Sequence, residues 1–310
     1  MDDRQKQLIR EERRKERRAA KGRTREERVA IRKAARLADG LTRATADGAP
    51  ASGKALGPLA LDHKHLHHGS TDLPLLFLSH HKCASSLAGG YVRQFCATNN
   101  LSFFGNAKGN TLPSARHDVS FLGNASYPFL AERVTTRGIH IIRNPLNVVL
   151  SAYYSHLRTH HVIGLPMLAA QRGVLEQCSV EEGIALTLAF CERNEFYAAT
   201  PGPLCALRQW NFDNDQFTTV RMEEFGDRID LALAGAMGTK AARYTWPEPH
   251  AFTFRAMSGG REPGTVDDRS PYSSGHPDAW RKELSKPIIA YIRAHYRSIL
   301  ERFYPNALLD

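Results

Sequence analysis

The fold of this chain is decided by the stretch Leu73-Pro-Leu-Leu-Phe-Leu-Ser-His-His-Lys-Cys-Ala-Ser-Ser-Leu87. Its first half is a short apolar run that ends in small and polar residues, which is typical of a buried parallel strand leading into a loop. A helix is expected to follow over residues 85–98, because Tyr91 and Phe95 lie four residues apart and would share one face. The stretch therefore predicts a strand, a loop and a helix that packs on a sheet.

The rest of the chain repeats this alternation. We expect further strands at residues 101–104, 118–123, 138–142 and 216–221. Helical patterns occupy residues 127–135, 146–158, 180–199, 223–236 and 285–303. The order predicts an α/β domain with a mostly parallel sheet flanked by helices. Ligands of such sheets bind at the carboxyl ends of the strands, so chemistry is expected in the loops after Ser79 and Ile142.

The composition excludes several classes of protein. The chain has 310 residues, of which 42% are hydrophobic and 24% charged, unlike a collagen-like or wholly disordered protein. No apolar run approaches the ~20 residues that a membrane-spanning helix needs. The first residues resemble no signal peptide, so we expect a cytoplasmic protein. Five cysteines without a CxxC pair indicate reduced thiols and no zinc site.

The basic charge is concentrated at one end of the chain. Residues 1–43 hold 16 Lys and Arg against 8 Asp and Glu, whereas the remaining residues hold 26 against 24. We therefore expect a basic extension at 1–43, a linker at 44–70 and one α/β domain at 71–310. The extension predicts a solvated segment, helical or disordered; the alternative is contact with an anionic partner, namely nucleic acid, a membrane surface or another protein.

The loop after the first strand has the features of an anion site. It leads into a helix N-terminus, where free N–H groups and the helix dipole favour a negative charge, and Lys82, Ser85 and Ser86 add a cation and two hydroxyls. It is not the usual nucleotide loop, because His81 and Cys83 stand where GxxxxGK[ST] requires glycine and a hydroxyl. The pattern predicts a phosphate cradle of another kind.

A second anion-binding pattern follows the strand at 138–142. It reads Arg143-Asn-Pro-Leu-Asn-Val-Val-Leu-Ser151-Ala-Tyr153, with Pro145 at a position that suits the start of a helix. Six residues separate Pro145 from Ser151, which is nearly two helical turns. The Ser151 hydroxyl can therefore return to the face on which Arg143 lies, and the pair suits a second phosphate.

Together these segments resemble the sulfotransferases that use 3′-phosphoadenosine 5′-phosphosulfate (PAPS). The residues Lys82-Cys-Ala-Ser-Ser86 resemble the family's loop K-[ST]-G-[ST]-[ST], with Cys83 and Ala84 as departures. The segment from Arg143 resembles R-[DN]-P-x-[DN]-x-[VIL]-x-S-x-[YF]. Residues 275–285 resemble the region G-x-W-[RK]-x-x-[LF]-[ST], with Arg269 upstream where members often have a basic residue.

The resemblance implies a P-loop-like sulfotransferase fold, PAPS as co-substrate and no required metal. It assigns the 5′-phosphosulfate to the loop residues Lys82, Cys83, Ala84, Ser85 and Ser86. It assigns the 3′-phosphate to Arg143 and Ser151, with Arg269 nearby. Lys82 would also neutralise the bridging oxygen of the departing nucleotide. Adenine contacts are not implied, because Leu87 and Met222 stand where members often have Trp and Tyr.

The acceptor's proton should pass to a general base. The family's position for it falls near residues 123–125, which offer none, so His117 is our candidate. The run from Tyr153 to His161 is the next candidate. Within it, His156 and His160 lie four residues apart and could share a helix face as metal ligands, but an ordinary place on the surface or in the acceptor pocket is favoured. The acceptor is expected to be a small molecule, a carbohydrate or a lipid with a hydroxyl or amine.

Two other functions stay open from the sequence. A nucleotide-dependent kinase with an atypical phosphate loop would need Mg²⁺ and a carboxylate to hold it. A non-enzymatic protein would use the basic extension to bind an anionic partner, with an affinity that falls steeply with salt. The sequence does not indicate the oligomeric state.

Overall fold

The computed structural model describes residues 75–107, 110–163, 165–196, 200–225, 229–267, 269–270 and 272–309. The extension expected at 1–43 and the linker expected at 44–70 lie outside these residues.

Five parallel strands form one sheet in the order β2-β3-β1-β4-β5. Their bounds are β1 Leu75–Leu78, β2 Phe103–Asn106, β3 Val119–Leu122, β4 Gly138–Ile142 and β5 Phe217–Arg221. All five expected strands are present, and the predicted α/β class is confirmed. The sequence places β1 first, yet it lies at the centre of the sheet, between β3 and β4.

The helices follow the strands in alternation. Their bounds are α3 Ser85–Thr98, α4 Tyr127–Ala131, α5 Pro145–Tyr154, the π-helix η2 Ser155–Thr159, α6 Pro166–Leu175, α7 Val180–Cys191, α8 Pro203–Gln209, the 3₁₀ helix η3 Met222–Phe225, α9 Ile229–Met237, η4 Gly238–Arg243, η5 Pro249–Phe252, α10 Phe254–Met257, α11 Trp280–Glu283, α12 Lys286–His295, α13 Arg297–Phe303 and η6 Pro305–Leu308.

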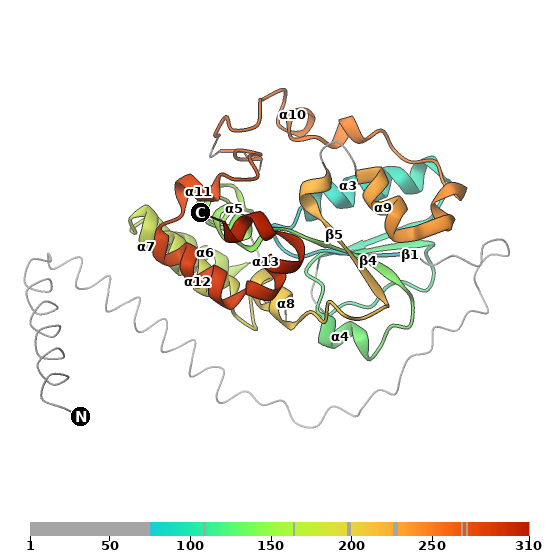
Figure 1. Cartoon of the computed structure of the whole chain (residues 1–310), viewed down its shortest axis with the longest axis horizontal. Helices are drawn as coiled ribbons and strands as arrows, with labels where there is room; N and C mark the ends of the chain where they lie inside the picture. The colour runs from blue at the N-terminus through green and yellow to red at the C-terminus, as the bar shows by residue number, and fades with distance from the viewer. Residues whose placement is uncertain are drawn as a thin grey trace, which may run out of the picture. The chain divides into compact units, whose positions relative to one another are not determined.

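The two faces of the sheet are covered by different helices. Side chains alternate along a strand, so Phe77 faces one way while Leu76 and Leu78 face the other. Phe77 packs in a core with α3 and α9, whereas Leu76 and Leu78 pack with α4 and Trp210. Figure 1 shows α3 and α9 on one side of the strands and α4 on the other. This layering leaves the carboxyl ends of the strands for a site.

A third core lies where α5 packs against α7, α12 and α13. Residues 285–303 were expected to form one helix, but the helix is interrupted at Tyr296. This side chain is buried, and its hydroxyl donates to Glu192 at 2.7 Å. The amphipathic period continues through the break, so the pattern alone does not reveal it.

The helix expected at 127–135 is present but ends at Ala131. Three further predicted helices differ in other ways from the observed ones. The helix expected at 146–158 becomes a π-helix from Ser155, and the helix expected at 180–199 ends at Cys191. The helix expected at 223–236 is replaced by η3 and α9, because residues 222–225 form a 3₁₀ turn directly after β5. Each of these three differences lies close to the site described below or to residues outside the described ranges.

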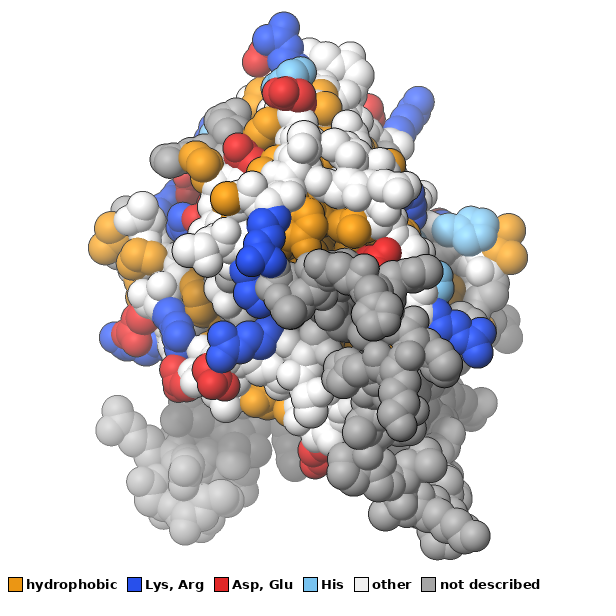
Figure 2. All heavy atoms as spheres, turned by 90° about the vertical axis from the view of Figure 1, so that its right-hand side faces the viewer, with side chains coloured by type: hydrophobic (Ala, Val, Ile, Leu, Met, Phe, Trp, Pro, Cys, Tyr) orange, Lys and Arg blue, Asp and Glu red, His pale blue; other side chains and the backbone are white. Residues whose placement is uncertain are grey.

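The surface of the domain carries both signs of charge. Figure 2 shows acidic and basic side chains interspersed on the face that it views. This agrees with the near balance of 26 basic and 24 acidic residues beyond position 43. Within the described ranges, no helix has both the length and the apolar character that crossing a membrane requires.

Candidate functional site

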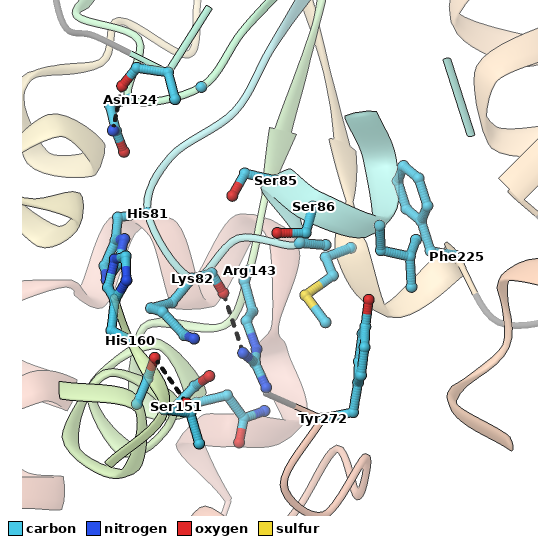
Figure 3. Close-up of a pocket in the computed structure, with 18 of the residues that line it drawn as sticks. His81, Lys82, Ser85, Ser86, Asn124, Arg143, Ser151, His160, Phe225 and Tyr272 are labelled. Atoms are coloured by element: carbon cyan, nitrogen blue, oxygen red, sulfur yellow. Dashed lines mark hydrogen bonds between the residues drawn. The ribbon is translucent and has the colours of Figure 1, made fainter. Parts of the chain in front are cut away.

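A cavity of about 1540 Å³ lies at the carboxyl ends of the strands. Its walls come from the loop after β1 and the first turn of α3, from the ends of β2 and β3, from α5 and η2, and from segments after β5. Figure 3 shows Lys82, Arg143 and Ser151 directed toward one another in this cavity. The structure thus brings the two anion-binding patterns of the sequence to the same place.

The backbone of the loop after β1 is shaped to bind an anion. Lys82 and Ala84 both have a positive φ, of 62° and 56°, while the intervening Cys83 does not. Alternation of this kind turns successive N–H groups toward one point, as in anion-binding nests. The Ser79 hydroxyl fixes the turn by donating to the Cys83 carbonyl at 2.8 Å. The loop ends at Ser85, where the first turn of α3 adds further N–H donors.

Ala84 occupies a backbone conformation that favours glycine, since its φ of 56° is left-handed. Replacing Ala84 with glycine should therefore raise the free energy of unfolding by about 0.5–1 kcal/mol, or at worst leave it unchanged. Urea unfolding measures the change. The matched control is Ala170→Gly in the middle of α6, where the exposed alanine is helical and glycine should cost about 1 kcal/mol. Equal losses in both variants would contradict this account.

Arg143 is delivered to the cavity by the end of β4. The next residue, Asn144, caps α5 by accepting from the Leu146 N–H at 3.1 Å, and Pro145 occupies the first helical position. The strand and the cap together fix the backbone on both sides of Arg143. Its Nη1 donates to the carbonyl oxygen of Lys82 at 3.1 Å. The guanidinium therefore adjoins the anion-binding loop, and Ser151 lines the cavity from α5.

The two cations of the site are held in a partly desolvated environment. Burial and the neighbouring Arg143 lower the pKa of Lys82 to about 8. Burial also lowers the pKa of Arg143, while Glu223 opposes this effect. Two like charges side by side, with the cavity in front of them, are stabilised by a ligand that carries several negative charges.

Glu223 links this pair of cations to the C-terminal segment. Its Oε1 accepts from the Asn144 N–H at 3.1 Å, and its Oε2 accepts from the Tyr304 hydroxyl at 3.0 Å. Glu223 also lines the cavity. The carboxylate thus fixes the loop that carries Arg143 by bonding to its backbone, and leaves the guanidinium directed at the Lys82 loop.

One end of the cavity is apolar. Figure 3 shows Phe225 and Tyr272 on the same side of the cavity as Ser86. The apolar and aromatic lining residues beside the start of α3 are Leu87, Met222, Phe225, Phe252, Phe254 and Tyr272. Aromatic and thioether side chains suit a planar ring system. No local spacing predicts this group, because its members come from α3 and from four segments after β5 that only the fold brings together.

The structure does not bring two of the predicted site residues to the cavity. His117 precedes β3 and so lies at the amino end of that strand, whereas the cavity is at the carboxyl ends. Its Nδ1 lies 2.6 Å from the Ser114 Oγ. Our assignment of His117 as the base is therefore corrected. Arg269 is exposed and does not belong to the cavity lining, so its expected place near the 3′-phosphate is not supported either.

Cys83 is fully buried and contributes backbone rather than side chain to the loop. Burial raises the pKa of its thiol to about 12, so the group is a neutral thiol at physiological pH. Ala84, Ser85 and Ser86 all line the cavity. Among the described residues, no group of three or more His, Cys, Asp or Glu side chains is arranged to hold a metal ion.

The remaining wall contains residues that the sequence analysis did not assign. Among them are His81, Asn106, Asn124, Ser155, Thr159, Leu165, Pro166, Met167 and Thr200, together with the earlier candidate His160. Asn106 and Asn124 stand at the ends of β2 and β3, a position at which polar residues could have been singled out. None of these described residues carries a carboxylate, an ammonium or a guanidinium group.

Comparisons with known proteins add little to this geometry. Neither a protein-family model nor a curated protein matches the chain. A solved structure of the mouse sulfotransferase SULT7A1 complexed with PAP is similar, with 12% sequence identity and a TM-score of 0.47, over 77% of this chain and 90% of that chain. At this identity and TM-score the likeness does not bear on activity. The fold assignment rests on the parallel sheet described above, and the site on its own residues.

Proposed function

We propose that the protein is a sulfotransferase that moves a sulfuryl group from PAPS to a hydroxyl or amine acceptor. The observation that carries the proposal is that Lys82, Arg143 and Ser151, which come from two separate motifs, line one cavity. A donor with phosphates at both the 5′ and the 3′ position of one ribose needs two neighbouring anion sites, separated by the width of that sugar. The loop at Lys82 and the start of α5 supply them, and the apolar end at Phe225 suits the base.

In this proposal the protein acts by positioning the donor and stabilising charge. An acceptor atom attacks the sulfur in line, and negative charge develops on the bridging oxygen of the departing adenosine 3′,5′-bisphosphate. Lys82, beside the N–H groups of α3, neutralises this oxygen. Arg143 and Ser151 hold the 3′-phosphate. No step of this scheme requires a metal ion.

The acceptor side of the cavity supports an uncharged acceptor. Its described residues offer hydroxyl, amide and imidazole groups beside an apolar edge at Leu165 and Met167. A small molecule, a carbohydrate or a lipid headgroup with a free hydroxyl or amine would meet these groups without an unpaired buried charge. A location in the cytoplasm and contact of residues 1–43 with an anionic partner stay predictions.

Calorimetry with three nucleotides tests the proposal. Adenosine 3′,5′-bisphosphate should bind about 100-fold or more tightly than AMP, because AMP lacks the phosphate assigned to Arg143. ATP should bind no more tightly than AMP, with or without Mg²⁺. Tighter binding of ATP in the presence of Mg²⁺ would favour the kinase alternative. Absence of nucleotide binding, with tight and salt-sensitive binding of nucleic acid, would favour the non-enzymatic alternative.

The affinity for adenosine 3′,5′-bisphosphate should fall as the pH rises above about 8. The ammonium form of Lys82 binds the anion, and its pKa in the free protein is about 8, so the protonated fraction decreases above that pH. Binding should be nearly constant from pH 7 to 7.5 and then weaken by up to about tenfold per pH unit. Calorimetry from pH 7 to 9.5 measures this. Lys82→Arg, which stays charged, should remove the dependence, and an unchanged slope in that variant would contradict the assignment.

A further inference from the structure

Three histidine rings stack against one another, close enough to Lys82 for its charge to act on each of them. His81 comes from the loop after β1, and His156 and His160 come from the end of the helix that begins at Pro145. The ring of His81 is stacked on that of His160, with centroids 5.0 Å apart and an interplanar angle of 11°. It is stacked on His156 at 5.1 Å and 28°. Figure 3 shows His81 and His160 side by side at the wall beside Lys82.

The π-helix brings His160 to this wall. The His160 N–H donates to the Ser155 carbonyl at 2.7 Å, a bond across five residues. In an α-helix, each residue is rotated slightly further around the helix axis than the residue four positions before it. The wider π-turn rotates the next residue of such a series back toward the starting face. As a result Asn147, Ser151, Ser155 and Thr159, all spaced by four, line the cavity together.

Arg172 of α6 holds the turn in place. Its Nε donates to the His156 carbonyl and its Nη2 to the His160 carbonyl, both at 2.6 Å. These carbonyls lie at the end of the helical segment, where intrahelical donors are lacking. The backbone of His160 is therefore fixed from outside the cavity, and its ring faces the acceptor side of the wall.

Of the three rings, His160 is the most exposed, and both it and His81 line the cavity. His156 is fully buried, and His81 is 8% exposed. The Nε2 atoms of His81 and His156 lie 2.9 Å apart and share a hydrogen bond, which engages both rings. His160 is half-buried and lines the cavity, next to Thr159.

We propose that His160 is the general base that removes the proton from the acceptor; this rests on the proposed function above. The acceptor O–H or N–H bond breaks, and its proton moves to a ring nitrogen of His160. The electron pair of that bond forms the new bond to sulfur. The bond between sulfur and the bridging oxygen breaks, and its electrons leave with adenosine 3′,5′-bisphosphate, next to Lys82. No further reactant is needed.

The charges around His160 suit this role. Burial, then Lys82 and then Arg172 lower its pKa to about 4, so the ring is neutral and able to accept a proton at physiological pH. The negative charges of a bound donor would offset the charge of Lys82. They would raise the pKa of His160 toward the range in which a base is effective.

The test compares His160→Ala with His161→Ala, an adjacent exposed histidine outside the cavity lining. The rate of adenosine 3′,5′-bisphosphate release from saturating PAPS is measured with water and with 4-methylphenol as acceptors. His160→Ala should lower the rate by about 10²–10⁴-fold, and added imidazole should restore at least part of it. His161→Ala should keep the wild-type rate. The affinity of His160→Ala for adenosine 3′,5′-bisphosphate should stay within about twofold of wild type, because the proposal places the ring against the acceptor and assigns the nucleotide to other residues.

Other outcomes separate this inference from the proposed function. A His160→Ala protein that binds the bisphosphate normally and turns over at more than about a tenth of the wild-type rate would overturn the base assignment alone. A loss of rate in His160→Ala that imidazole does not restore would also overturn the base assignment alone. So would a wild-type protein that binds the bisphosphate but releases none of it from PAPS with either acceptor. A folded wild type that does not bind the bisphosphate at all would overturn the proposed function, and the base assignment with it.

Discussion

Replacing Arg143 with alanine should weaken the binding of adenosine 3′,5′-bisphosphate by about 100-fold or more and leave the binding of AMP nearly unchanged. The guanidinium is partly desolvated, and a phosphate that loses such a partner stays in the cavity with its charge unpaired. The loss should therefore exceed that of an exposed ion pair, which is about 0–1 kcal/mol. Calorimetry on both nucleotides, with each variant checked for folding by circular dichroism, measures the ratio of the affinities.

Two further substitutions sharpen the Arg143 experiment. Arg143→Lys keeps the charge but loses the planar fork, so its affinity should lie between those of wild type and Arg143→Ala. Arg297→Ala is the matched control, because this arginine is exposed on α13 and pairs only with Glu301 among the described salt bridges. Equal weakening of bisphosphate and AMP in Arg143→Ala would mean that Arg143 does not discriminate the 3′-phosphate.

Acidification should unfold the protein between about pH 5 and 5.5. His80, His81, His140 and His156 are buried, and burial is the largest cause that lowers the pKa of each. The unfolded chain binds their protons near pH 6.5, whereas the folded chain does not, so stability is complete above that pH and is lost as the pH falls below it. A ring that stays neutral in the folded chain costs about 1.4 kcal/mol of stability at pH 5.5, so four such rings together cost about 6 kcal/mol. This is comparable with the whole stability of a typical domain.

Urea unfolding at several pH values measures this dependence. Below pH 6, removal of one buried imidazole by His156→Gln should reduce the slope of unfolding free energy against pH by about 1.4 kcal/mol per unit. His161→Gln changes an exposed ring and should leave the slope unchanged. A wild-type protein that stays folded and equally stable down to pH 4 would show that the buried rings bind protons in the folded state.

Local sequence patterns predicted the framework of the domain well. The helix at Ser85–Thr98 and the strand at Gly138–Ile142 have the predicted bounds, since an apolar period and a clear boundary residue coincide in each. Lys82, Arg143 and Ser151 reached one cavity because the carboxyl ends of parallel strands meet at one edge of the sheet.

The acceptor side of the site could not be predicted in the same way. His160 reaches the cavity through a π-turn, which a period of 3.6 residues does not anticipate. The sequence shows that His117 is close to a strand, but not how far it lies from the ligand. His117 stands at the amino end of β3, whereas the cavity is at the carboxyl ends, so the prediction failed. The aromatic group at Phe225 and Tyr272 depends on long-range packing, which the local spacing of residues does not predict.

The central position of β1 also sets the order in which the molecule can assemble. Leu76 pairs with Ser120 of β3 on one side and with Gly138 of β4 on the other, so both strand neighbours of β1 are parts of the chain that are synthesised later. Pairings so distant in sequence slow folding, because loop closure costs entropy before any contact compensates for it. On the ribosome, the Lys82 loop must wait for Arg143 to emerge before the two anion sites can form. A nascent chain that ends before β4 therefore contains the phosphate loop but lacks Arg143, which completes the site.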